Sequence, residues 1–212
     1  MIRILYEDRQ IAVCVKPAGV LSQDAGEQSL PGLLRAQLGR DYVGVVHRLD
    51  REVGGVMVYA LTDKAAAALS RAVQERRLEK TYLAVLRGVP AEPEAALEDL
   101  LFHDKAKNKT YVVDRLRKGV KDARLDYTVL ETREDRTLVR VRLHTGRTHQ
   151  IRVQFASRKL PLVGDGKYGG KEPGVPLGLW SAELSFPHPI TGTIMTFTQA
   201  PPDREPWNWF QI

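Results

Sequence analysis

Short runs of β-branched, aromatic and other apolar residues recur along the chain, with turn-forming residues between them. The separating residues include Pro17, Gly19, the pair Gly54 and Gly55, and Gly192. Such runs predict β-strands, because β-branched and aromatic side chains favour extended backbone, whereas glycine and proline end it. Nine strands are predicted in this way, at residues 2–6, 11–15, 43–46, 56–61, 81–86, 125–130, 138–143, 179–186 and 193–197.

Two segments have the pattern of helices. Ser29 and Pro31 are typical of a helix start, several leucines follow, and Gly39 is typical of a helix end. Thr62 can cap a second helix that runs through an alanine-rich stretch to about residue 78. Residues 147–157 fit either a strand or a helix, and the glycine-rich segment 164–178 predicts a loop with demanding backbone geometry.

The order of these elements predicts the fold class. Strands outnumber helices and do not alternate strictly with them, which favours an α+β fold with a mixed, mostly antiparallel sheet and flanking helices. The sequence contains no internal repeat, low-complexity tail or linker. A single domain over residues 1–212 is therefore predicted.

Composition places the chain among ordinary globular proteins. Its 212 residues are 43% hydrophobic and 27% charged, which excludes a disordered or collagen-like chain. A single cysteine cannot form an internal disulfide, which favours a reducing compartment. No apolar run approaches the ~18 residues that a membrane span needs, and charges near the N-terminus interrupt any signal-peptide core. We therefore expect a cytoplasmic protein without membrane contact.

Positive charge is concentrated in one stretch. The chain has 32 Lys and Arg residues against 26 acidic ones, a net charge of +6. Residues 103–121 contain seven Lys or Arg against two Asp. From charge alone, a solvated loop or hairpin face is the favoured interpretation, and contact with a polyanion is the alternative.

A first candidate site is the segment from His47 to Arg51, in which Asp50 lies between Arg48 and Arg51. Nearby guanidinium groups favour the charged form of a carboxylate, and a nucleophilic or basic aspartate must be charged at neutral pH. The alternative is a structural ion pair at the end of a strand, which would be the favourite for an isolated Asp–Arg pair.

A second candidate is the segment from His144 to Arg152. Gly146 permits a tight turn, and Arg147 is a fixed cation that can bind a carboxylate or phosphate through two hydrogen bonds. A zinc site with His144 and His149 is the rival interpretation. Their five-residue spacing suits neither a helix face nor one side of a strand, and no Cys or carboxylate cluster completes a ligand set, so no metal is expected.

Three weaker signals come from the rest of the chain. Tyr82 lies near the start of a predicted strand, where a tyrosine usually packs in the core with its hydroxyl at the rim. The segment from Gly164 to Gly169 lacks the Gly-Lys-Ser/Thr ending of a phosphate-binding loop. Cys14 lies in an apolar strand and is expected in the core.

Taken in order, these segments resemble the RluA-type pseudouridine synthase family. The resemblance rests on Lys-Pro-Ala-Gly at 16–19, His-Arg-Leu-Asp at 47–50, Lys-Thr-Tyr-Leu-Ala at 80–84, Thr-Gly-Arg-Thr-His-Gln-Ile-Arg at 145–152, and Gly-Asp with Tyr-Gly at 164–169. Residues 184–189 and the prolines at 201–202 resemble the family's closing segment. The resemblance spans nearly the whole chain, but no separate N-terminal RNA-binding domain is expected at this length.

This resemblance implies an enzyme that converts specific uridines of structured RNA to pseudouridine in a central RNA-binding cleft, without metal or organic cofactor. Asp50 matches the essential aspartate, Tyr82 the tyrosine that stacks on uracil, and Arg147 the arginine that pairs with the aspartate. The target base must be flipped out of its stack, and Arg48 is a candidate wedge. The expected RNA contacts are His47, Arg48, Arg51, Lys105, Lys107, Lys109, Arg117, Lys118, Thr148, His149, Gln150 and Arg152.

The chain departs from the usual family pattern at two places. Val53, Gly54 and Gly55 stand where Thr or Ser, Ser and Gly are common, and Leu61 stands where a lysine is common. Ribosomal and transfer RNA both stay open as substrates, the expected protein is a monomer, and no DNA is expected. Alternative interpretations are a non-catalytic RNA-binding protein and a glycosidic hydrolase that uses Asp50 with Asp165.

Overall fold

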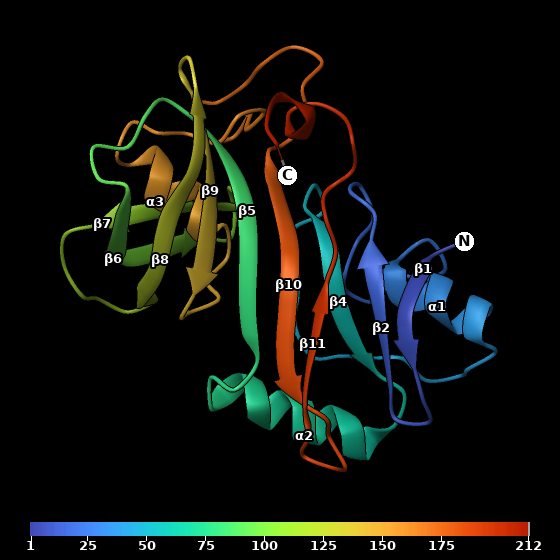
Figure 1. Cartoon of the computed structure of the whole chain (residues 1–212). Coiled ribbons are helices and arrows are strands. Elements are labelled where there is room, and N and C mark those ends of the chain that lie inside the picture. Colours follow the sequence, from blue (N-terminus) through green and yellow to red (C-terminus); the bar gives the residue numbers. More distant parts are fainter. Residues whose placement is uncertain (212) are drawn as a thin grey trace. The chain divides into compact units, whose positions relative to one another are not determined.

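The fold is α+β, as predicted, and a computed structural model of the chain describes residues 1–211. Helices and strands are distributed over two compact units (Figure 1). The first unit contains residues 1–80 and 180–201, and the second contains residues 81–179 and the segment from 202 onward. The segment from His47 to Arg51 lies entirely within the first unit, and the segment from His144 to Arg152 lies entirely within the second.

The first unit is built on a mixed sheet. Strand β1 (Arg3–Glu7) pairs antiparallel with β2 (Ile11–Lys16), and β2 pairs antiparallel with β4 (Gly54–Ala60). Strand β4 also pairs with the short β3 (Gly44–Val45) and, in parallel, with β10 (Leu179–Pro187), which pairs with β11 (Ile194–Thr198). The parallel β4–β10 pair makes the sheet mixed rather than purely antiparallel.

Two capped helices complete this unit. Helix α1 (Leu30–Leu38) begins where the Ser29 hydroxyl accepts a hydrogen bond from the Gly32 amide and ends at Gly39, whose φ is 61°. Helix α2 (Asp63–Gln74) begins at the predicted cap Thr62. It ends four residues earlier than predicted, because Arg76 takes a left-handed backbone conformation that turns the chain toward β5. Apolar side chains of α2, β2, β4 and β10 form the buried core.

The second unit contains five strands in the order β5-β9-β8-β6-β7. They are β5 (Glu79–Arg87), β6 (Glu94–Asp104), β7 (Lys109–Val113), β8 (Val120–Arg133) and β9 (Arg136–Leu143). The pairs β6–β7, β6–β8 and β8–β9 are antiparallel. Strands β6 and β7 were not predicted. The basic stretch 103–121 contains the end of β6, the turn to β7, β7 itself, and the connection from β7 to the start of β8.

The ambiguous segment is a helix. Helix α3 (Gln150–Ala156) packs against β6 and β7, with Val153 in a buried cluster with Leu101 and Ala123. A 3-10 helix follows near the end of the chain (Trp207–Trp209). The predicted loop at 164–178 is confirmed: Gly164 has a φ of +75°, and a Cβ there would lie 2.1 Å from the Pro176 carbonyl oxygen. Within residues 1–211, no helix is both long and apolar enough to cross a membrane.

Candidate active site

The Asp50 segment is a tightly held connection between β3 and β4. Leu49 is buried, and its backbone forms two hydrogen bonds with the Ser22 side chain: the hydroxyl donates to the Leu49 carbonyl (2.7 Å) and accepts from its amide (3.2 Å). Asp50 itself is half-buried, whereas Arg48 and Arg51 are exposed. The polypeptide therefore presents Asp50 on a fixed backbone at the border between protein and solvent.

Lys16 is the main support of this connection. Its side chain is completely buried, and its ammonium group donates to the carbonyl oxygens of Pro17 (2.9 Å), Arg51 (3.0 Å) and Val53 (2.7 Å). Burial lowers the pKa of Lys16 to about 8, and the negative charge of Asp50 partly opposes this effect. The lysine of the Lys-Pro-Ala-Gly motif thus holds the backbone that follows Asp50 with a buried cation, while Ser22 holds Leu49 before it.

The other polar residues of the segment have partners in the same unit. The buried His47 accepts a hydrogen bond at Nε2 from the Val58 amide (3.1 Å), and burial, aided by the charge of Lys80, holds its pKa well below 6.5. His47 is therefore a neutral, internal residue, and its predicted contact with RNA gains no support from this position. Arg51 donates to the Gly19 carbonyl (2.9 Å), and the exposed Arg48 donates to the Gln23 side chain (3.0 Å).

Two departures from the family pattern, Gly54 and Leu61, have a local explanation, and the neighbouring Gly55, which matches the pattern, is equally confined. A Cβ at Gly54 would lie 2.4 Å from the Trp180 ring, and a Cβ at Gly55 would lie 2.2 Å from the Ser181 carbonyl oxygen. The large indole on the paired strand β10 therefore requires glycine where the family commonly has serine. Leu61 is buried, 7% exposed, so an apolar side chain suits this position better than a lysine.

In the second unit, Arg147 contacts Asp122. Its Nε donates to the Asp122 carbonyl oxygen (2.7 Å), and its Nη2 donates to the Asp122 carboxylate (3.3 Å). The Arg147 side chain remains 31% exposed. Its pairing with Asp50 stays a prediction, as does the joining of both with Tyr82, which is buried on β5 in the second unit.

Gln150 organises the turn that carries Arg147. Its side-chain oxygen accepts hydrogen bonds from the Thr145 hydroxyl (2.8 Å) and from the Arg147 amide (3.0 Å), and its side-chain nitrogen donates to the Arg124 carbonyl (3.1 Å). Only 3% of Gln150 is exposed. These contacts show that Gln150 positions the turn. A direct contact of its side chain with RNA stays a prediction. Thr148 is tied to β7 through its carbonyl, which accepts from the Thr110 hydroxyl (2.8 Å).

Arg152 forms a buried ion pair that the sequence analysis did not find. Its Nε and Nη2 donate to the two carboxylate oxygens of Asp165 at 2.7 and 2.8 Å, and the two side chains are only 4% and 0% exposed. Asp165 also accepts from the backbone amides of Lys167 (3.0 Å) and Tyr168 (3.1 Å). A carboxylate held by four donors is a poor partner for Asp50 in hydrolysis, and the structure gives this alternative no support. Arg152 is likewise an internal residue, and its predicted contact with RNA gains no support from this position.

Tyr168 connects this ion pair to the basic hairpin. Its hydroxyl accepts from the Thr110 amide (2.8 Å) and lies 2.9 Å from Nδ1 of His149, while the Arg152 guanidinium lies 5.3 Å from its ring. Burial raises the pKa of Tyr168. His149 is buried, with 8% exposed, and its contact with the Tyr168 hydroxyl makes it part of the same network. The second motif, the glycine-rich loop and β7 thus form one connected assembly.

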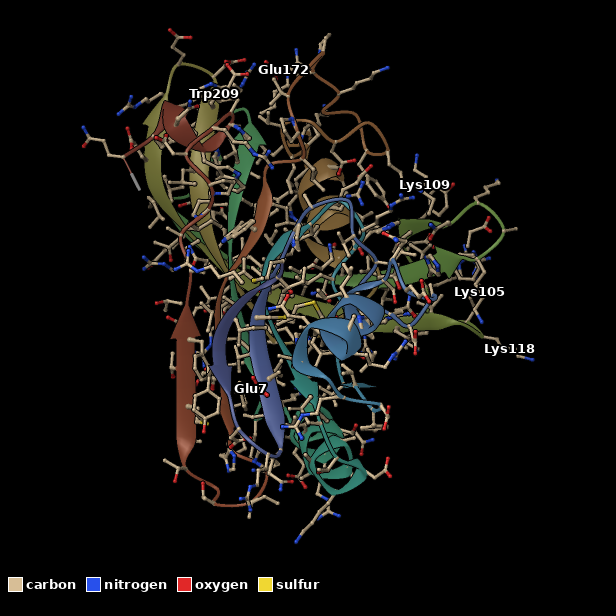
Figure 2. The ribbon with its side chains drawn as sticks, turned by 90° about the vertical axis from the view of Figure 1, so that its right-hand side faces the viewer. Glu7, Lys105, Lys109, Lys118, Glu172 and Trp209 are labelled. Atoms are coloured by element: carbon tan, nitrogen blue, oxygen red, sulfur yellow. The ribbon has the colours of Figure 1, made fainter. Side chains whose placement is uncertain are left out.

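The basic stretch forms an outer surface of the second unit. Figure 2 shows Lys105, Lys109 and Lys118 on the same side of this unit. Lys105, Lys107, Arg117 and Lys118 are exposed. Lys109 is half-buried and lies 5.4 Å from the Tyr168 ring, and Lys167 donates to the Asn108 carbonyl (2.7 Å). The hairpin is thus fixed to the glycine-rich loop while its cations face solvent.

Comparison with known proteins assigns the chain to a family. Residues 10–157 match the family described as RNA pseudouridylate synthase, and this range contains Asp50, Tyr82 and Arg147. The chain belongs to this family. An uncharacterized RNA pseudouridine synthase of Aquifex aeolicus is 36% identical, over 99% of this chain and 73% of that protein. The ribosomal large subunit pseudouridine synthase D of Xanthomonas campestris is 38% identical over 80% of this chain, which spans about half (52%) of that relative.

A solved structure supports the same family assignment. The human RNA pseudouridylate synthase domain containing 1 superposes with a TM-score of 0.81, at 25% identity, over 95% of this chain and 84% of that protein. The resemblance to RluA-type pseudouridine synthases is thereby confirmed, as is the enzyme class of an RNA-modifying isomerase.

The rival zinc site finds no support in this family member's geometry. His144 pairs with the Asp126 carboxylate, and His149 contacts the Tyr168 hydroxyl. In the part of the chain that the structure describes, no group of three or more His, Cys, Asp or Glu residues is placed to hold a metal ion.

Proposed function

We propose that this pseudouridine synthase isomerises specific uridines in structured RNA by base flipping, with Asp50 acting directly on the nucleotide and without a cofactor. The observation that carries the proposal is the support of Asp50. A half-buried carboxylate lies on a backbone that Lys16 and Ser22 hold from inside the protein. Catalytic groups need such fixed placement, because small displacements of a reacting group reduce rates strongly.

The isomerisation breaks the bond between ribose C1′ and uracil N1 and forms a bond between C1′ and C5. The proton at C5 is lost, N1 gains a proton, and the RNA mass is unchanged. The Asp50 carboxylate can attack the ribose, attack the ring, or remove the 2′ proton, and all three routes stay open. Tyr82 is proposed to stack on the uracil and to assist removal of the C5 proton.

An arginine is proposed to pair with Asp50 and keep it charged. Arg147 is the residue that the family resemblance indicates. Arg152 is a second candidate, because it is buried and its orientation is fixed through two bonds to Asp165. A guanidinium held in this way is well suited to orient a carboxylate.

Ribosomal RNA is the proposed substrate, because the Xanthomonas campestris relative is named for the large ribosomal subunit. A transfer RNA stem-loop is the alternative. Exposed cations of the basic stretch are proposed to contact phosphates, which can offset the flipping cost of about a few kcal/mol. We expect the protein to act as a monomer in the cytoplasm.

Asp50→Asn and Asp50→Ala test the proposal, with the exposed Asp41→Asn as matched control. RNA from cells that lack the gene, carrying each variant in turn, is treated with a carbodiimide that marks pseudouridine and read for reverse-transcriptase stops. Wild type and Asp41→Asn should restore a stop that both Asp50 variants fail to restore, while their affinity for RNA changes by no more than a few-fold. Near-normal modification by either Asp50 variant would show that another group performs the chemistry.

A further inference from the structure

The connection between β7 and β8 carries an unusual apolar residue at its tip. Leu116 is 72% exposed, more than any other large hydrophobic side chain within residues 2–211. Its neighbours in the sequence are Arg115, Arg117 and Lys118, all exposed, with Asp114 as the one acidic residue of this connection. A leucine at this exposure contributes little apolar burial to the isolated protein, and three cations lie beside it in the sequence.

The connection is fixed to the sheet. Gly119 has a φ of +88°, and the Val120 amide donates to the Arg117 carbonyl (3.0 Å), which closes a turn directly after Leu116. The Arg117 guanidinium lies 5.2 Å from the Phe102 ring on β6. Leu116 is therefore displayed on a turn that is closed by a backbone hydrogen bond and that contacts β6 through Arg117.

Strand register places this turn beside the other cations. Val120 lies opposite Phe102 and Lys109 lies opposite Asp104, so both the start of β8 and the turn at 105–108 lie at the same end of β6. Figure 2 shows Lys105 and Lys118 extending from this end. The surface around Leu116 is thus positive on more than one side. Such a surface complements the negative charge of a phosphate backbone and is poorly suited to bind in an apolar groove of a partner protein.

We infer that Leu116 is an apolar wedge that inserts between stacked bases of the substrate RNA, with Arg115, Arg117 and Lys118 on the flanking phosphates. Proteins that distort nucleic acids use exposed leucine, isoleucine or phenylalanine side chains in this way, next to basic residues. The inference rests on the proposed function for its choice of ligand. It assigns a separate task to this turn: opening the RNA stack, which lowers the cost of exposing the target base.

The experiment compares Leu116→Ser with Leu116→Phe and with Val89→Ser, which changes an apolar residue that is 55% exposed outside the basic stretch. The probes are ribosomal and transfer RNA stem-loops with 2-aminopurine at successive positions, whose fluorescence rises when the base is unstacked. Wild type, Leu116→Phe and Val89→Ser should raise the fluorescence at one step. Leu116→Ser should abolish most of this rise and weaken binding by about tenfold.

Salt dependence separates the wedge from its cations. Leu116→Ser should leave the slope of log affinity against log salt unchanged, whereas replacing Arg115, Arg117 and Lys118 with glutamine should reduce it by about 2–3. Equal thermal midpoints for Leu116→Ser and wild type establish that the fold is intact. A wild-type fluorescence rise that Leu116→Ser retains, or no rise in any stem-loop, would overturn the inference.

Two further outcomes are informative. If Leu116→Ser is normal on protein-free RNA and impaired only on ribosomal particles, the tip contacts a protein and the inference is wrong. If wild type unstacks a base through Leu116 but forms no pseudouridine, the wedge stands and the proposed catalytic function fails.

Discussion

Replacement of Lys16 by methionine tests the claim that a buried cation holds the Asp50 backbone. Methionine retains the apolar length of the side chain but removes the ammonium group, so three carbonyl oxygens, of Pro17, Arg51 and Val53, lose their shared donor. At about 2 kcal/mol for each lost hydrogen bond from a charged donor, the loss is about 6 kcal/mol.

The cost of burying the ammonium group offsets part of this loss. A fall of the Lys16 pKa from 10.5 to about 8 corresponds to about 3 kcal/mol, since each pKa unit is worth about 1.4 kcal/mol. Lys16→Met should therefore reduce the free energy of unfolding by about 2–3 kcal/mol. Its turnover on a substrate RNA should fall by more than its affinity for that RNA, because the backbone at Asp50 loosens.

The pH dependence of stability supplies a second signature. Because the pKa of Lys16 is lower in the folded than in the unfolded protein, the unfolded chain binds more protons between pH 8 and 10.5. The wild-type free energy of unfolding should gain a rising contribution over this range, and Lys16→Met should lack it. Urea denaturation followed by tryptophan fluorescence measures both, with the exposed Lys64→Met as control. A Lys16→Met protein with wild-type stability, turnover and pH dependence would refute the reasoning.

The buried ion pair and the choice of arginine give two further predictions. Asp165→Asn leaves the Arg152 guanidinium buried beside a neutral group and should lower the free energy of unfolding by about 3–5 kcal/mol, whereas Asp122→Asn, with a carboxylate that is 72% exposed, should cost less than about 1 kcal/mol in urea denaturation. Equal losses would contradict the structural role of the pair. Arg147→Lys and Arg152→Lys are compared in single-turnover assays. If one of these arginines pairs with Asp50 as proposed, its replacement should lower the rate at least about tenfold, equivalent to about 1.4 kcal/mol. Unchanged rates in both would exclude either arginine from this role.

The sequence predicted elements well where local preferences and final structure agree. All nine predicted strands and both capped helices are present, because β-branched runs and the caps at Ser29 and Thr62 act locally. Strand β6 was missed, since its segment is rich in alanine and leucine and has leucines at 97, 100 and 101, a spacing that also suits a helix. Pairing with β7 and β8, at both of its edges, determines its extended form.

The candidate site was predictable as a set of residues but not as a set of contacts. Lys16 donates a hydrogen bond to the carbonyl of Arg51, 35 positions away, and no local sequence pattern predicts a contact between such distant residues. Arg152 and Asp165 likewise meet only because α3 and the glycine-rich loop pack together, although both residues were visible in the motifs. The charge of residues 103–121 was visible too, but its display on a hairpin depends on β6 and β7, two strands that the sequence pattern did not reveal.

The contacts divide the motif residues by the kind of effect that their loss should have. Lys16, Gln150 and Asp165 are buried, and each bonds to backbone groups or to one fixed cation inside its own unit. Such residues act through the position of another group, so their loss should reduce turnover and stability more than affinity. Exposed residues such as Arg48 and Leu116 contribute little to the stability of the isolated protein. Their replacement should instead reduce RNA affinity and base unstacking. A motif residue that is both deeply buried and fully bonded is therefore a poor candidate for RNA contact, even where the family motif includes it.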